Sequence, residues 1–444
     1  MIAMRIKAER HQPAEIPGLA ARRVAVGAID AVLSRHERLD EAMESNPGLE
    51  RLEPRDRAFA TALARTTMQR LGEVLALVEG HLARGWPSRG GSLKAILACA
   101  VAQLLYMDVA EHAAVDQAVR LAREDKDAGH FTGLANAVLR AITREGKPAA
   151  QPLANLPPWL MARWMRAYGA DVTEAMAAAQ LSEPPLDVTA RSNAKAWADT
   201  LGGKLLPQGT IRLTRHSGPI SALPGYEEGA WWVQDAAALL VVLAAGSLKG
   251  RSVLDLCAAP GGKAAALAAR GARVTAVDRD PARLARLMRN MDRLRLKVQP
   301  VVRDMMEVDL GAPYDVVLLD APCSATGTLR RHPDVAWLKR EGDIATLARQ
   351  QAAMLDRAAS QVGDGGLLIY STCSLEPEEG EQQVTSFLDR SRGFVLDPIA
   401  PDEIGGYAGM ISSVGTLRSR PDMLKEDGGI DGFFVARLRK IAQN

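Results

Sequence analysis

The sequence is poor in cysteine, and the few cysteines present exclude two common classes of protein. Four cysteines in 444 residues are too few for a disulfide scaffold: Cys99, Cys257, Cys323 and Cys373. None of them forms a C-x-x-C pair, so the sequence has no zinc signature and we expect no metal site. Isolated thiols in a reducing compartment are available for chemistry.

Long apolar runs and a large charge imbalance are also absent. No segment approaches the roughly 20 apolar residues that span a bilayer, and the chain is charged from Arg5 onward. We therefore expect a cytoplasmic protein without membrane spans, with a monomer as the default state. The formal net charge of +2 predicts no partner by itself, because affinity for phosphates depends on local basic patches.

The sequence does contain enough apolar material for several folded domains. Hydrophobic residues make up 47% of the chain, and its length exceeds that of one ordinary domain. From about residue 20 to residue 145, apolar residues recur every three or four positions, as in Leu93, Ile96, Leu97 and Ala100. This pattern predicts an all-α N-terminal domain at 1–148. The proline-rich stretch 146–158 predicts a connector.

The remaining sequence predicts two further domains. Residues 159–235 combine a helical opening at 159–180 with alternating segments at 186–190 and 210–214, which is typical of a small α+β domain. Residues 236–444 alternate buried strands with helices, which predicts a Rossmann-like α/β domain whose parallel sheet is covered on both faces. We expect its strands at 252–256, 273–278, 298–302, 314–320 and 366–370, with a last, antiparallel strand at the edge at 432–438.

The turn after the first of these strands has the composition of a ligand-binding loop. Its small residues allow a ligand to approach the main chain closely: Cys257, Ala258, Ala259, Pro260, Gly261, Gly262 and Lys263. A nucleoside triphosphate loop would need glycine at 257 and serine or threonine at 264, and the dinucleotide motif G-x-G-x-x-G is missing. A nucleoside cofactor without a pyrophosphate fits better.

Several acidic residues share the same predicted edge of the sheet. Asp278 ends the second strand, where a carboxylate receives ribose hydroxyls in nucleoside-binding domains. Asp304 and Asp320 follow the third and fourth strands, and Asp255 lies in the first. Acids gathered at one edge are costly unless they bind something, so a cationic cofactor rich in hydroxyl and amine groups is a good candidate.

Two cysteines follow neighbouring strands at that edge. Cys323 comes after the fourth strand and Cys373 after the fifth, each beside serine or proline rather than within an apolar run. We expect both thiols to face one crevice and to take part in covalent chemistry, since a permanent disulfide is disfavoured in a reduced cytoplasm. Cys99 lies in an amphipathic helix and is expected to be a core residue.

Five motifs resemble those of the RNA 5-methylcytosine methyltransferase family, in particular its bacterial ribosomal RNA branch, the Sun/Fmu-like enzymes. They are LDLCAAPGGK at 254–263, VDRDPARL at 277–284, LLDAPCSATGTLRRHPD at 318–334, YSTCSLEPEEGE at 370–381 and DGFFVARL at 431–438. The helical N-terminal domain is similar to the RNA-binding fold of the antitermination factor NusB, with FTGLANAVLRAI at 131–142 as the most similar stretch.

The resemblance implies a cofactor and roles for the residues named above. S-adenosylmethionine is bound by the loop 257–263 with Asp278, Asp304 and Asp320, Cys373 attacks a cytosine in RNA, and Cys323 assists product release. Two positions depart from the family pattern: Ala264 stands where threonine is common, and 185–193 replaces the usual apolar-Arg-Val-Asn run. The reasoning from residues alone does not separate the roles of the two cysteines.

Basic residues near the predicted crevice are candidates for contacts with RNA. Arg330 and Arg331 directly follow the fourth-strand motif, and we expect them to bind phosphates. Arg283, Arg286 and Arg293 are either an RNA contact or simply the solvated side of a helix. Two other functions stay open: an RNA-binding assembly factor with an inert catalytic half, and an enzyme that modifies transfer RNA.

Overall fold

The structure, a computed structural model, describes residues 18–213, 218–307, 311 and 313–442. The chain divides into two compact units, 1–155 and 156–444. Residues 1–17 of the predicted helical domain and Thr214 of the predicted strand 210–214 lie outside the described residues. Within the described residues, no helix combines the length and the apolar character that a membrane crossing needs.

The first unit is helical in all its described elements, as predicted. Leu93–Tyr106 (α6) is its central helix, and 11 of its 14 residues are buried, Cys99 among them. Five helices pack against it: Leu19–Asp30 (α1), Pro54–Gln69 (α4), Leu71–Gly80 (α5), Glu111–Glu124 (α7) and Thr132–Glu145 (α8). Two short helices, Leu39–Glu44 (α2) and Pro47–Arg51 (α3), pack against α1. The burial of α6 on most faces follows from its sequence, which is apolar apart from Lys94, Gln103 and Tyr106.

The second unit begins with two helices and a small antiparallel sheet. Pro158–Tyr168 (α9) and Ala170–Gln180 (α10) are separated by Gly169, whose φ is 83°. The sheet has the order β2-β3-β1-β4 and is covered by Ala194–Leu201 (α11); its strands are Leu186–Ala190 (β1), Lys204–Leu205 (β2), Thr210–Leu213 (β3) and Trp231–Val233 (β4). This is the predicted small α+β fold.

A buried ion pair joins two strands of this small sheet. Asp187 and Arg212 are cross-strand partners and form two hydrogen bonds, of 2.7 and 2.6 Å. Arg212 also donates to the carbonyl of Gly429 at 2.6 Å, so the small sheet is tied to the C-terminal part of the same unit.

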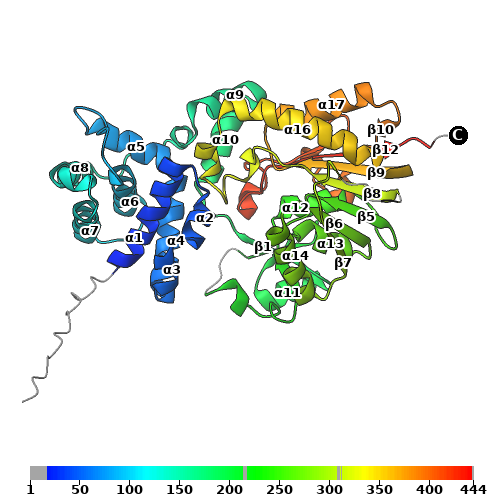
Figure 1. Cartoon of the computed structure of the whole chain (residues 1–444), viewed down its shortest axis with the longest axis horizontal. Coiled ribbons are helices and arrows are strands. Elements are labelled where there is room, and N and C mark those ends of the chain that lie inside the picture. The colour runs from blue at the N-terminus through cyan, green and yellow to red at the C-terminus, as the bar shows by residue number, and fades with distance from the viewer. Residues whose placement is uncertain (1–17, 214–217, 308–310, 312, 443–444) are drawn as a thin grey trace, which may run out of the picture. The chain divides into compact units, whose positions relative to one another are not determined.

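The large sheet has the order β10-β12-β9-β8-β5-β6-β7, and β5 to β9 are parallel. Figure 1 shows α12 to α14 on one face and α16 and α17 on the other. Its elements are Ala236–Leu243 (α12), Ser252–Leu256 (β5), Gly262–Ala269 (α13), Arg273–Asp278 (β6), Pro281–Leu294 (α14), Val298–Val302 (β7), Tyr314–Asp320 (β8), Val335–Leu338 (α15), Glu341–Ser360 (α16), Val362–Thr372 (β9), Glu381–Arg390 (α17), Phe394–Leu396 (β10), Leu417–Arg418 (β11) and Phe434–Lys440 (β12).

Each face of this sheet has its own apolar core, because alternate strand residues point to opposite faces. Val253 and Val316 pack with α12 to α14, whereas Leu254 and Val317 pack with α16 and α17. The doubly covered parallel sheet predicted from the strand–helix alternation is confirmed.

The last strand differs from its prediction in one respect. β12 is antiparallel to β9, as expected, but it is not at the edge, because Phe394–Leu396 pairs along its other side. A three-residue strand is too short to give a recognisable alternating pattern, so the sequence alone does not reveal it.

Candidate active site

The loop between β5 and α13 has a main-chain course that ordinary residues rarely adopt. Cys257 has φ of 63° and Gly261 has φ of 105°, both in the left-handed region. A Cβ atom at Gly261 would lie 2.7 Å from Cγ of Leu287, whereas one at Gly262 would meet its nearest atom at 3.7 Å. Glycine is therefore required at 261, because the loop packs directly against α14.

Asp278 holds this loop in place from the end of β6. Its side chain is buried, and its two carboxylate oxygens accept hydrogen bonds from the main-chain N–H groups of Ala259 at 3.1 Å and Asp280 at 3.0 Å. The Arg283 guanidinium, which lies 3.6 Å from the same carboxylate, also donates to the carbonyl of Ala259 at 2.7 Å. A carboxylate has about four acceptor positions, so Asp278 has capacity left for a ligand.

A cleft of about 400 Å³ lies at this edge of the sheet. Three of the predicted cofactor residues line it, namely Cys257, Asp278 and Asp304, together with the apolar side chains of Met305 and Met354. A mostly apolar wall with a few carboxylates suits a ligand that has an aromatic ring and a hydroxyl-bearing sugar.

The other predicted cofactor residues do not line that cleft. Ala258 and Ala259 are buried, and Pro260, Gly261 and Gly262 line a separate groove beside Arg286. Lys263 and Asp320 lie on the side of the two thiols instead. The loop 257–263 therefore contributes Cys257 to the cleft and Lys263 to the surroundings of the two thiols, which its sequence alone does not reveal.

Lys263 and Asp320 form a pair close to Cys373. Nζ of Lys263 donates to Asp320 at 2.7 Å, and Ser371 Oγ donates to the other carboxylate oxygen at 3.0 Å. Burial lowers the pKa of Lys263, but Asp320 and the nearby Cys373 more than offset this, so the pKa lies above its usual value. The lysine thus stays a cation beside Cys373.

The thiols of Cys323 and Cys373 are in contact, as the predicted crevice requires. Their sulfur atoms lie 3.4 Å apart and both cysteines are free. The hydrogen bond to Cys373 raises the pKa of Cys323 well above its usual value, and burial adds to this effect. Cys323 therefore keeps its proton while its sulfur stays in contact with that of Cys373.

The two remaining cysteines are unsuited to nucleophilic chemistry. Burial raises the pKa of Cys99 to about 12, and its side chain is 1% exposed. This confirms the prediction of a core residue. Burial, with Asp320 and Asp278 nearby, also raises the pKa of Cys257 to about 12, so its thiol stays protonated.

Asp255 lies deeper than its place among the edge acids suggests. It is fully buried in β5, and neither carboxylate oxygen has a hydrogen-bond partner among the described residues. Burial raises its pKa to about 8, and Asp320 and Asp278 contribute in the same direction. Asp255 is consequently protonated at neutral pH rather than one more edge anion.

The structure argues against Arg330 as a contact to RNA. Its side chain is 2% exposed, donates to the carbonyl of Gly428 at 2.6 Å and lies between the carboxylates of Asp235 and Asp431. Arg331 pairs with the same Asp431 and is 34% exposed. The sequence pattern was misleading because two adjacent arginines after a strand look solvated, whereas their acidic partners lie about 100 residues away in the chain.

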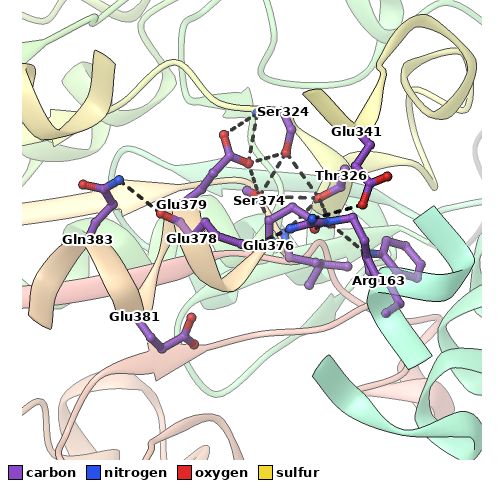
Figure 2. A network of polar contacts seen from close by, with 12 residues as sticks. Arg163, Ser324, Thr326, Glu341, Ser374, Glu376, Glu378, Glu379, Glu381 and Gln383 are labelled. Atoms are coloured by element: carbon purple, nitrogen blue, oxygen red, sulfur yellow. Dashed lines mark hydrogen bonds and ion pairs between the residues drawn. The ribbon is translucent and has the colours of Figure 1, made fainter. Parts of the chain in front are cut away.

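A buried carboxylate network behind the thiols was not predicted. Glu379 contacts Ser324 and Ser374, the residues that follow the two cysteines, and Glu376 is held by Arg163 of α9 (Figure 2). In the sequence these glutamates belong to an acidic run, which ordinarily indicates a solvated surface. No single-sequence pattern distinguishes them from exposed acids.

Comparison with known proteins places these features in context. Residues 243–439 match the family model described as 16S rRNA methyltransferase RsmB/F, and residues 19–144 match that of the NusB family. The ribosomal RNA small subunit methyltransferase B of Yersinia enterocolitica is 33% identical over 443 residues, which cover 94% of this chain and 98% of that protein.

Two solved structures are similar as well. The crystal structure of PH0851 has a TM-score of 0.76 at 23% identity and covers 97% of this chain and 100% of its own. A methyltransferase homologue from Pyrococcus horikoshii has a TM-score of 0.53 at 26% identity and covers 63% of this chain and 94% of its own.

Proposed function

Because the chain belongs to the RsmB/F family of 16S rRNA methyltransferases, we propose that it methylates carbon 5 of a cytosine in small-subunit ribosomal RNA through a covalent Cys373–cytosine adduct. S-adenosylmethionine supplies, when bound, the electrophilic methyl group on its sulfonium. The observation that carries the proposal is the contact between two free thiols at adjacent ends of parallel strands, where the pKa of Cys323 is raised well above its usual value.

A nucleophilic thiolate is what this chemistry requires. Carbon 5 of cytosine is a poor nucleophile until a thiolate adds to carbon 6, which forms an S–C6 bond and makes carbon 5 enamine-like. Cys373 suits that role, because its sulfur contacts that of Cys323 and lies close to the Lys263 ammonium. After methyl transfer, a base removes the proton on carbon 5 and the S–C6 bond breaks.

The base of that last step is Cys323 or a water molecule. Cys323 holds its proton while Cys373 is a thiolate, so it can accept the carbon 5 proton only after giving its own proton away. Asp320, which accepts hydrogen bonds from Lys263 and Ser371, would hold the exocyclic amine or ring nitrogen of the cytosine. Cys323 thus acts in release rather than in attack.

The cofactor side of the proposal relies on the cleft beside Asp278. Asp278 and Asp304 would receive the hydroxyl groups of the cofactor, and Met305 and Met354 would contact its ring. The target cytosine has to leave its stack to reach the thiols, which costs a few kcal/mol in a duplex and less in a loop. Unpaired ribosomal RNA is therefore the expected substrate.

Methyl transfer from labelled S-adenosylmethionine to small-subunit RNA tests the proposal, with transfer RNA as a second substrate. Cys373→Ala should lower the rate by about a thousandfold or more, because the nucleophile is lost. Cys323→Ala should accumulate a denaturant-resistant protein–RNA adduct. Cys99→Ala, which alters a buried thiol of the first unit, is the matched control and should keep its activity. Full activity of Cys373→Ala would refute the adduct, and transfer RNA as the preferred substrate would refute the ribosomal assignment.

A further inference from the structure

Glu379 is a buried carboxylate that lies directly behind the two thiols. It ends the turn Pro377–Glu379, and its side chain has no solvent exposure. Its carboxylate accepts hydrogen bonds from the N–H of Ser324 at 3.0 Å, from the hydroxyl of Ser324, and from the hydroxyl of Ser374 at 2.5 Å. The Gln351 amide on α16 donates to it at 2.9 Å (Figure 2 shows its serine contacts).

These contacts join the two loops that carry the cysteines. Ser324 follows Cys323 and Ser374 follows Cys373, and the two serine hydroxyls lie 3.0 Å apart. One carboxylate therefore holds the residue next to each thiol. Because a contact of 3.4 Å between two sulfurs allows little displacement, a shift of either loop would separate them.

The neighbouring Glu376 shows what is unusual about Glu379. Glu376 is equally buried, but Arg163 donates to it at 2.6 Å and Trp164 at 3.0 Å. Among the described residues, the structure records no Lys or Arg ion pair for Glu379. A buried anion without a cation is costly unless several donors converge on it. Apart from Gln351 of α16, the donors that converge on Glu379 belong to the thiol loops, so the burial of this carboxylate depends on the geometry of those loops.

The charge of Glu379 also acts on the thiol pair directly. It is one of the groups that raise the pKa of Cys323, after the hydrogen bond to Cys373 and burial. The carboxylate thus favours the proton on the sulfur of Cys323, which leaves Cys373 as the nucleophile. An uncharged side chain of the same shape would keep part of the contacts and lose this effect.

We propose that Glu379 is a positioning residue that, through Ser324 and Ser374, holds the two sulfurs in contact. The inference rests on the proposed function for its catalytic meaning, but the distance between the thiols can be tested without RNA. A glutamine at this position has no charge and places an amide N–H₂ group where one carboxylate oxygen now accepts, so the serine hydroxyls that donate there have to turn and accept instead.

The test compares Glu379→Gln with the wild-type full-length protein in two assays. In methyl transfer, kcat should fall by about a hundredfold with KM for S-adenosylmethionine and RNA within about twofold, because only the reacting groups are displaced. In the second assay, diamide takes two electrons and two protons from the thiols and a Cys323–Cys373 disulfide forms. Its rate should fall about tenfold in the variant, as read by alkylation of free thiols.

Two further variants control the experiment. Glu381→Gln changes a half-exposed glutamate two residues away from Glu379. The amide oxygen of the new glutamine can still accept from Arg418, so both rates should stay at the wild-type level. Glu379→Asp keeps the charge with a shorter reach and should recover part of kcat. If Glu379→Gln does not fold, as judged by near-ultraviolet circular dichroism, Ser324→Ala with Ser374→Ala takes its place with the same expected losses.

Each outcome separates this inference from the proposed function. A folded Glu379→Gln protein that cross-links at the wild-type rate would overturn the positioning role, whatever its activity. Unchanged kcat in that variant would overturn it as well. An active Cys373→Ala enzyme would instead refute the covalent mechanism and leave the cross-linking result standing.

Discussion

The loop after β5 and the two thiol loops after β8 and β9 lie at the same edge of one sheet, but different contacts hold them. The first loop depends on its main chain: two left-handed residues, and the N–H of Ala259, which binds Asp278. The thiol loops depend on side chains from distant segments, above all Glu379 and the Arg330–Asp431 pair. The cofactor side should therefore be sensitive to glycine replacement, and the thiol side to the loss of a single charge.

The largest effect is expected on the thiol side, from Arg330→Ala. This change leaves the buried carboxylates of Asp235 and Asp431 without their shared cation, which should lower the free energy of unfolding by about 3–5 kcal/mol. Arg331→Ala removes a partly exposed guanidinium from the same Asp431 and should cost about 1–2 kcal/mol. Urea unfolding at pH 7 measures both. Equal losses would contradict the view that buried charge pairs hold this side.

The same difference explains how much of the site was predictable from sequence. Small residues in a turn and acids at strand ends are local signals, so the β5 loop, Asp278 and the two cysteines could be identified. Glu379 and the partners of Arg330 could not be identified, because their roles depend on contacts between segments that only folding brings together. Acidic and basic runs look solvated in sequence, whether or not the fold buries them.

The fold was predictable for a related reason. Buried parallel strands are nearly continuous apolar runs, and the five parallel strands were located from the sequence with β5, β6, β7 and β8 at their observed bounds, although the edge strand β7 is not buried. The domain boundaries at 148, 159 and 235 stay a prediction. Placing Phe394–Leu396 beside β12 needed the structure, since the pairing of a short strand is a tertiary property.

A smaller effect is expected on the cofactor side, from Gly261→Ala. The new Cβ would lie 2.7 Å from Leu287, and alanine would have to keep a φ of 105°, which together should cost about 1–3 kcal/mol. Gly262→Ala is the matched control, because its Cβ meets no atom closer than 3.7 Å, and its stability should stay within about 1 kcal/mol of the wild type. Calorimetry should find weaker S-adenosylmethionine binding in the first variant only. If the two variants have the same stability and the same affinity for S-adenosylmethionine, the main chain of the loop can adopt another conformation at residue 261 without loss.

The smallest effect is expected from Asp255 in β5. Its pKa is raised both by Asp320 of the thiol side and by Asp278 of the cofactor side, so it reports on the two sides together. Its folded pKa of about 8 exceeds the roughly 3.9 of an unfolded aspartate, so between these values the native state holds a proton that the unfolded chain lacks. Wild-type stability therefore falls as pH rises through this window, by about 1.4 kcal/mol per unit for this group. An asparagine side chain in its place would not titrate.

The stability of Asp255→Asn relative to the wild type should accordingly increase by about 1.4 kcal/mol from pH 6 to pH 7 and level off above pH 8. Asp315→Asn is the control at the start of β8. Hydrogen bonds from Ser252 lower the pKa of Asp315, so its contribution changes only below about pH 4 and its relative stability should be constant from pH 6 to pH 7. Urea unfolding across this range measures both variants. A constant difference for Asp255→Asn would mean that Asp255 is ionised in the folded protein, and that burial, Asp320 and Asp278 do not raise its pKa above neutrality.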